Sequence, residues 1–267
     1  MPEKSHKKRP FTLLWILLAV ALSAVFALSC LDVIPSFFGY SPKSSGMAKV
    51  LFPDNKPVEM AADTVVADTV TEPVKFEPDT AAHTILFIGD SMLDGLSPRL
   101  AAYAKASGHT LYSVVWYSSS TEIWGKSHRL AEYIQRISPT YIFICLGANE
   151  LYVKDIAEKR TQFIREMLAE IDTIPYIWIG PPNWVEDTGI NKMIADNTAP
   201  GTYFKSDGMT FQRRSDGAHP TAKSAIEWMD SVVRWMPDNC AHPIRMTSPT
   251  ESTARPERIF IHQPGEN

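Results

Sequence analysis

The chain has 267 residues, of which 45% are hydrophobic and 21% charged, and its formal net charge is -4 at pH 7. This length is enough for one substantial domain with appendages, and the composition is that of an ordinary globular protein. A slightly acidic chain has no general attraction for a polyanion, so we do not expect a nucleic acid partner.

The N-terminal segment predicts a membrane anchor. Residues 1–10 contain several lysines and an arginine, and residues 11–31 then run without a charge. That run matches the ~20 apolar residues that cross a bilayer. Basic residues ahead of a span stay in the cytoplasm. We therefore expect a single-pass protein of the cytoplasmic (inner) membrane with its body outside, in the periplasm. The alternatives are a secreted protein with a cleaved signal peptide, whose apolar region is usually shorter, and a lipoprotein processed at Cys30.

Two further segments look like appendages. Residues 32–82 are rich in proline, threonine and acidic residues without a sustained apolar face, which predicts a flexible linker. Residues 237–267 are also rich in proline and polar residues, and we expect a C-terminal tail with one apolar patch at residues 259–261. The folded domain is therefore predicted to span residues 83–236. The three cysteines indicate no disulfide framework.

Between residues 83 and 236, patterns typical of strands and helices alternate. Apolar or β-branched runs predict strands at residues 85–88, 111–117, 141–146, 176–179 and 201–205. Helical spacing predicts helices at residues 93–107, 130–137, 156–171 and 220–236. Apolar strands that alternate with amphipathic helices favour a central parallel sheet covered on both faces, which is a three-layer α/β/α sandwich.

Polar residues follow these strands at the edge of the sheet where α/β proteins bind ligands. Ser91 comes directly after the first strand and is a candidate nucleophile. Serine becomes reactive only when a base within hydrogen-bond reach takes its proton, and His219 is the candidate for that base. Asp216 lies three residues before His219, close enough for a turn to bring the two side chains together, and a carboxylate there would orient the imidazole.

Acyl transfer also needs donors for the developing oxyanion. The backbone N–H of Ser91, a backbone N–H of Ser119 or Ser120, and the side-chain amide of Asn149 are the candidates. Each motif has a plainer interpretation as a turn or a helix cap. The motifs occur together, each after a strand or before the last helix, and this combination favours catalysis.

Three motifs resemble blocks I, III and V of the SGNH (GDSL-type) hydrolases: Gly89-Asp90-Ser91, Gly147-Ala148-Asn149-Glu150 and Asp216-Gly217-Ala218-His219-Pro220. The resemblance covers residues 84–236 and implies the flavodoxin-like α/β/α fold of that superfamily. It also implies a Ser91–His219–Asp216 triad, with Asn149 as an oxyanion donor.

Block II departs from the family pattern, because Ser118-Ser119-Ser120 stands where the family usually has a glycine. Ser119 and Ser120 therefore both stay candidates for its backbone donor. Asp90 and Met92 stand on either side of Ser91, Trp184 follows the fourth strand, and we expect all three to line the substrate. No cluster of cysteine and histidine has the spacing of a metal site, so we expect neither a metal nor a cofactor.

The resemblance implies an enzyme that acts on esters. Together with the predicted anchor, it favours a serine esterase for short-chain (acetyl) esters of a cell-envelope glycan. Four aromatic residues near the predicted edge could stack on sugar rings or belong to the core: Trp116, Tyr117, Trp124 and Trp184.

Three other functions stay open. The first is an O-acetyltransferase acting on peptidoglycan or exopolysaccharide, with a membrane acyltransferase as a partner. The second is a lipase or lysophospholipase, against which the sequence shows no broad apolar lid. The third is a non-catalytic module that binds polysaccharide, against which the intact set of site residues argues.

Overall fold

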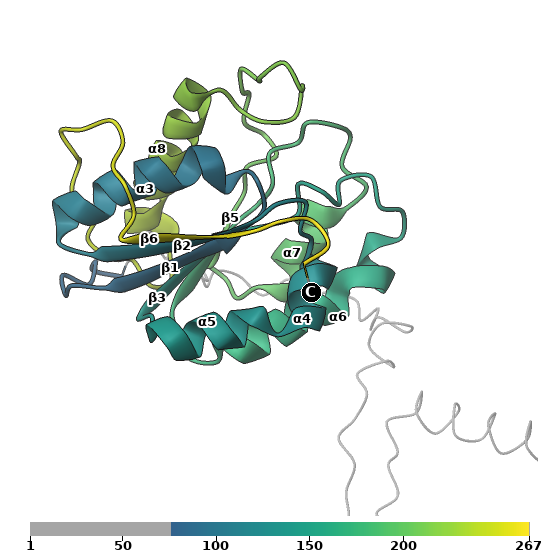
Figure 1. The fold of residues 1–267 in the computed structure, drawn as a ribbon, viewed down its shortest axis with the longest axis horizontal. Coiled ribbons are helices and arrows are strands. Elements are labelled where there is room, and N and C mark those ends of the chain that lie inside the picture. The colour runs from purple at the N-terminus through teal and green to yellow at the C-terminus, as the bar shows by residue number, and fades with distance from the viewer. Residues whose placement is uncertain (1–75, 267) are drawn as a thin grey trace, which may run out of the picture. The chain divides into compact units, whose positions relative to one another are not determined.

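The computed structural model describes residues 76–266 (Figure 1). The predicted anchor and nearly all of the predicted linker lie outside the described residues. Within residues 76–266, none of the helices has both the length and the apolar character that crossing a bilayer requires.

Among these residues, six parallel strands form one sheet in the order β5-β4-β3-β1-β2-β6. The strands are β1 (Thr84–Gly89), β2 (Thr110–Trp116), β3 (Tyr141–Cys145), β4 (Tyr176–Ile179), β5 (Tyr203–Phe204) and β6 (Arg258–His262). The first five occupy the places that the apolar runs predict. The central position of β1 explains why its residues are apolar on both faces.

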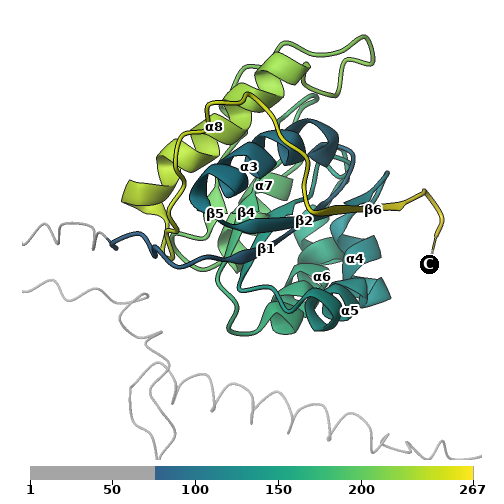
Figure 2. The same cartoon turned by 60° about the vertical axis from the view of Figure 1, so that its left-hand side comes forward.

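Helices cover both faces of the sheet (Figures 1 and 2). They are α3 (Leu93–Ser107), α4 (Thr121–Ser127), α5 (Arg129–Ile137), α6 (Ile156–Ile171), α7 (Ile190–Asn197) and α8 (Ala222–Asn239). Ile85 and Phe87 of β1 share a core with α3 and α8, whereas Leu86 and Ile88 share the opposite core with α4 to α7. The three-layer α/β/α prediction is confirmed.

Two short helices were not predicted from the sequence. The polar run at residues 118–121 lies outside every strand and helix that the sequence predicts, yet α4 begins within it because the Ser120 hydroxyl caps the helix. Its oxygen accepts from Ile123 N at 3.3 Å, as a serine N-cap does. Helix α7 begins after Asp187, whose carboxylate accepts from Gly189 N and Ile190 N at 2.7 Å. Both signals are polar residues that sequence patterns assign equally well to turns.

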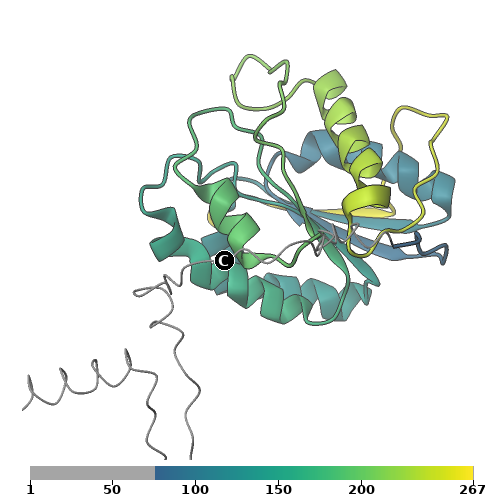
Figure 3. The same cartoon turned by 180° about the vertical axis from the view of Figure 1, so that it is seen from behind.

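The prediction of a C-terminal tail is wrong, because residues 237–266 belong to the fold. Helix α8 continues through Pro237 to Asn239. The chain then passes over α3 and α8 (Figures 2 and 3) and adds β6 in parallel beside β2. Arg99 on α3 holds this passage by donating to the carbonyls of Glu251 and Ser252 at 3.1 and 3.0 Å. An apolar run this short next to prolines gives no local sign of its partner strand.

The end of the predicted linker also belongs to the fold. Asp79 forms a parallel bridge with Ile244. Its N–H donates to Pro243 O at 2.8 Å, and its carbonyl accepts from Arg245 N at 2.8 Å. The described part of the domain therefore begins before residue 83 and ends after residue 236.

Strand β6 yields a direct test of this correction. The Phe260 ring packs against Tyr133 with 5.1 Å between centroids, and the guanidinium groups of Arg136 and Arg258 lie 4.8 and 5.0 Å from its centroid. Phe260→Ala should lower the free energy of unfolding by about 2 kcal/mol, because the contacts of this half-buried ring are lost. Urea unfolding of the full chain measures this change.

The matched control is Ile259→Ala, since Ile259 on the same strand is 47% exposed. That variant should cost less than about 1 kcal/mol. Equal effects of the two substitutions would mean that β6 is not docked on the sheet.

Candidate active site

Ser91 lies in the turn that joins β1 to α3. Gly89 ends the strand at a point where β3 leaves no room for a side chain, since an added Cβ would lie 2.1 Å from Cys145 O. The Asp90 carboxylate then closes the turn by accepting from Met92 N at 2.9 Å. These contacts place Ser91 at the carboxyl end of the central strand, as the sequence predicts.

Ser91, His219 and Asp216 form one connected chain of side chains. Ser91 Oγ lies 2.8 Å from His219 Nε2, and His219 Nδ1 lies 3.1 Å from Asp216 Oδ2. When Nδ1 carries the ring proton, its N–H donates a hydrogen bond to Asp216, and Nε2 is free to accept the serine proton. This is the geometry that a Ser-His-Asp triad needs in order to activate a serine nucleophile, and it joins residues 128 positions apart in the chain.

The loop that carries His219 is held by its own carboxylate. Asp216 Oδ1 accepts from the N–H groups of Ala218 and His219, both at 2.8 Å, and Gly217 adopts the positive φ of 71° that this turn needs. Hydrogen bonds from these two N–H groups hold the pKa of Asp216 below its ordinary value. The carboxylate therefore stays ionised and keeps the imidazole oriented.

Arg213 is a site residue that sequence reasoning does not find. Its guanidinium donates to Ala218 O through Nη1 and to Asn183 O through Nη2, the latter at 2.9 Å. It thus ties the His219 loop to the loop after β4. Nothing in the local sequence distinguishes Arg213 from its neighbour Arg214. Both acceptors of Arg213 are backbone carbonyls, which any residue has, and only the folded chain brings them close.

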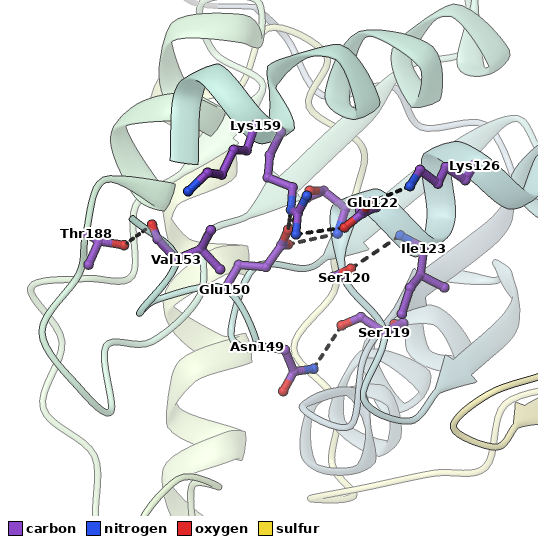
Figure 4. A network of polar contacts seen from close by, with 12 residues as sticks. Ser119, Ser120, Glu122, Ile123, Lys126, Asn149, Glu150, Val153, Lys159 and Thr188 are labelled. Atoms are coloured by element: carbon purple, nitrogen blue, oxygen red, sulfur yellow. Dashed lines mark hydrogen bonds and ion pairs between the residues drawn. The ribbon is translucent and has the colours of Figure 1, made fainter. Parts of the chain in front are cut away.

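The predicted oxyanion donors meet at the neighbouring turns. Asn149 Nδ2 donates to Ser119 O at 2.9 Å (Figure 4). A side-chain amide has two N–H groups, so one holds the loop after β2 and the second is available to a ligand. The structure thus brings Asn149 and Ser119 together.

The two serines of block II differ in what their N–H groups can do. The carbonyl of Ser119 faces Asn149, and because N–H and C=O of a trans peptide point in opposite directions, the Ser120 N–H points away from Asn149. This geometry argues against Ser120. The Ser119 N–H donates to Trp116 O at 3.1 Å and would reach an oxyanion only as a shared, three-centre bond.

Two of the three residues expected to line the substrate do not lie at the surface. Asp90 and Met92 are 0% and 5% exposed, so their side chains belong to the interior. Trp184 is half-buried, and its Nε1 donates to Ala148 O at 2.9 Å. Its hydrogen bond fixes the indole against the turn that carries Asn149.

The aromatic residues near the site divide in the same way. Trp116 and Trp124 are buried and pack edge to face with 5.4 Å between centroids, so they are core residues and no platform for a sugar. Tyr117 is half-buried, and its hydroxyl donates to the Asp94 carboxylate at 3.1 Å. Of the four aromatic candidates, Tyr117 and Trp184 keep some exposed surface.

Comparisons with known proteins find similar solved structures at low sequence identity. No family model and no curated protein sequence matches the chain. Among solved structures, it is similar to the psychrotrophic esterase EstA from Pseudoalteromonas sp., with 19% identity and a TM-score of 0.41 over 57% of this chain and 94% of that one. It is also similar to TesA, with 16% identity and a TM-score of 0.43 over 56% of this chain and 95% of that one.

A third similar structure is a two-domain esterase (CEX) active on acetylated mannans, at 12% identity and a TM-score of 0.43. The match covers 64% of this chain and 54% of that one, so the present chain spans about half of its length. At such identities and TM-scores, the function has to be inferred from the side chains of the site.

Asp90 gives a pH-dependent prediction. Burial raises the pKa of this carboxyl from 3.8 to about 7, although hydrogen bonds from Met92 N and Ala148 N oppose the rise. The neutral form therefore contributes stability that is fully present below the unfolded pKa of 3.8 and is lost as pH rises through about 7. Asp90→Asn cannot ionise, so its unfolding free energy should fall less than that of the wild type between about pH 5 and about pH 8.

The difference should be on the order of a few kcal/mol, measured by urea unfolding at both pH values. Asp94→Asn is the control, because it removes an exposed carboxylate one turn away. Parallel pH profiles for Asp90→Asn and the wild type would contradict the assignment of a buried acid to Asp90.

Proposed function

We propose that this protein is a serine esterase of the SGNH hydrolase superfamily that removes short acyl groups, chiefly acetyl, from a glycan of the cell envelope. The observation that carries the hydrolase assignment is the 2.8 Å contact between Ser91 Oγ and His219 Nε2, with Asp216 on the other ring nitrogen at 3.1 Å. This chain of contacts has no evident structural use, because the His219 side chain is 28% exposed and adds little to the core.

The first half-reaction forms an acyl-enzyme. Ser91 Oγ attacks the ester carbonyl carbon while its proton passes to His219 Nε2, and Asp216 stabilises the imidazolium that results. The tetrahedral intermediate collapses by breaking the bond to the alcohol oxygen, which takes the proton from His219. In the second half-reaction a water molecule attacks the acyl-enzyme, His219 again moves the proton, and the acid leaves Ser91.

The oxyanion of each tetrahedral intermediate needs donors that are already aligned. The Ser91 N–H and the second N–H of Asn149 supply two of them. The Ser119 N–H adds a third through a shared bond. Asn149 is held ready by its contact with Ser119 O, so it loses little freedom when charge develops.

The substrate class rests on access and on the predicted anchor. The side chains of His219 and Asp216 are 28% and 47% exposed, which lets a polymer-borne ester reach the triad from outside. An anchor in residues 11–31 would hold the domain against the envelope, where acylated glycans are the accessible esters. If the enzyme instead transfers acetyl groups to the glycan, the partner we propose is a membrane acyltransferase that supplies those groups.

An O-acetyltransferase is the second candidate. A sugar hydroxyl is an oxygen nucleophile like water, and His219 could deprotonate either one. The same exposure of the triad that admits an ester also admits an acceptor sugar. Hydrolysis remains the simpler proposal, because water needs no binding site of its own.

The triad assignment predicts a large loss of turnover. Ser91→Ala and His219→Ala should each lower kcat for p-nitrophenyl acetate by at least ~10³-fold, because triad members act as a unit. Ser215→Ala is the matched control, an exposed serine in the same loop as Asp216, and should stay active. A fluorophosphonate probe should label Ser91 in the wild type, and a folded Ser91→Ala protein that keeps most activity would refute the mechanism.

The acyl group is tested by chain length and by the natural acceptor. The full chain should prefer acetyl among p-nitrophenyl esters of increasing length, and it should release acetate from O-acetylated envelope glycan fragments. An acetyl donor supplied together with unmodified fragments distinguishes the transferase, which would give acetylated sugar by mass spectrometry. A marked preference for chains of about eight carbons or more would reject the acetyl proposal and favour a lipase.

A further inference from the structure

Glu150, the residue after Asn149, makes contacts that the triad mechanism does not use. Its side chain is buried, with 2% exposure. One carboxylate oxygen accepts from Thr121 N at 2.8 Å, and the other accepts from Thr121 Oγ1 at 2.8 Å. Figure 4 shows this carboxylate directed toward the start of α4, whereas the Asn149 amide is directed toward Ser119. Both oxygens of this buried carboxylate therefore bind Thr121, a residue 29 positions earlier in the chain.

Arg160 on α6 provides a positive charge beside the Glu150 carboxylate. Arg160 Nε lies 3.3 Å from Glu150 Oε1, at ion-pair distance but without hydrogen-bond alignment. Arg160 Nη2 also pairs with Glu122 Oε2 on α4 at 2.7 Å. Burial raises the pKa of Glu150, and the two bonds from Thr121 act in the opposite direction. The contacts together fix the first residue of α4 against the turn after β3.

These contacts close a ring that contains the oxyanion donor. Asn149 Nδ2 holds Ser119 O, the chain runs from Ser119 to Thr121, Thr121 donates to Glu150, and Glu150 is bonded covalently to Asn149. The ring leaves the Asn149 amide one orientation in which its second N–H is free. Opening the ring at Glu150 would free the segment that carries Ser119 O, and the Asn149 amide could then turn with it.

We propose that Glu150 is a positioning residue for the oxyanion hole: through Thr121 and the Ser119 carbonyl, it sets the orientation of the Asn149 amide. This inference rests on the proposed esterase function for its kinetic consequence, whereas the ring itself is independent of that function. Glu150 is 2% exposed, which leaves its side chain out of reach of a substrate, so we expect its effect on the rate to pass through Asn149.

The kinetic test uses the full chain and p-nitrophenyl acetate. Removing an oxyanion donor costs ~10²–10³ in kcat, which is the expected loss for Asn149→Ala. Glu150→Ala should lower kcat by about tenfold or more, with little change in KM, because the donor is present but poorly aimed. Glu150→Gln should recover part of this loss, since its amide oxygen can still accept from Thr121 N.

Glu170→Ala is the matched control. Glu170 has an 11% exposed side chain and its carboxylate accepts from Ala131 N near the start of α5 at 3.0 Å. It therefore makes the same kind of helix-start bond on the same side of the sheet, without touching the ring. Glu170→Ala should lower the unfolding free energy yet keep kcat close to that of the wild type.

The double variant separates positioning from general destabilisation. In a background of Asn149→Ala, the further change Glu150→Ala should lower kcat less than twofold, because the group that Glu150 orients is already gone. A multiplicative loss in the double variant, or a Glu150→Ala protein with wild-type kcat, would overturn the proposal while leaving the triad assignment intact.

A measurement that needs no substrate tests the ring of contacts independently of the esterase function. Hydrogen exchange followed by mass spectrometry should show faster exchange in residues 118–122 for Glu150→Ala than for the wild type or Glu170→Ala. Unchanged exchange in that segment would overturn the proposal even if the enzyme is active. If the wild type cleaves no ester, the esterase function fails, and faster exchange would still establish that Glu150 holds this loop.

Discussion

The site depends on the close approach of β1 and β3 at Gly89. An added Cβ there would lie 2.1 Å from Cys145 O, and the next N–H, that of Asp90, donates to this same carbonyl at 3.3 Å. Because the two strand ends touch, the turn with Ser91 and the turn with Asn149 begin side by side. Any residue larger than glycine would push these turns apart, so the motif's glycine is a packing requirement first.

The buried Asp90 carboxyl joins the same two turns a second time. It accepts from Met92 N at 2.9 Å, and the backbone N–H of Ala148 is close enough to lower its pKa. One of its oxygens, Oδ2, is buried without a hydrogen-bond partner among the described residues, and burial raises its pKa to about 7. A group of this kind lowers stability when it ionises, so its place in the site is better explained by the alignment of the two turns than by stability.

The sequence was sufficient for features that depend on local patterns. Apolar runs gave the places of β1 to β5, and the polar residues after them gave Ser91, Asn149, Asp216 and His219. The sequence was insufficient where a contact joins residues that only the folded chain brings together. Strand β6 needs β2, which lies more than a hundred residues earlier, and Arg213 binds carbonyls that carry no sequence signal. The polar run at Ser120 fits a loop and a helix cap equally well, and only the surrounding packing decides between them.

The two halves of the site lie in different surroundings, and their tasks explain why. His219 and Asp216 have side chains 28% and 47% exposed, where the leaving alcohol and the incoming water of the proposed reaction could exchange. Glu150 is 2% exposed, in an interior of low dielectric where hydrogen bonds are stronger and move less. Proton transfer tolerates contact with water, whereas oxyanion stabilisation depends on donors that are aligned before charge appears. The proposed mechanism therefore places the proton-transfer residues on an exposed loop and the oxyanion donors on a buried ring anchored to the sheet.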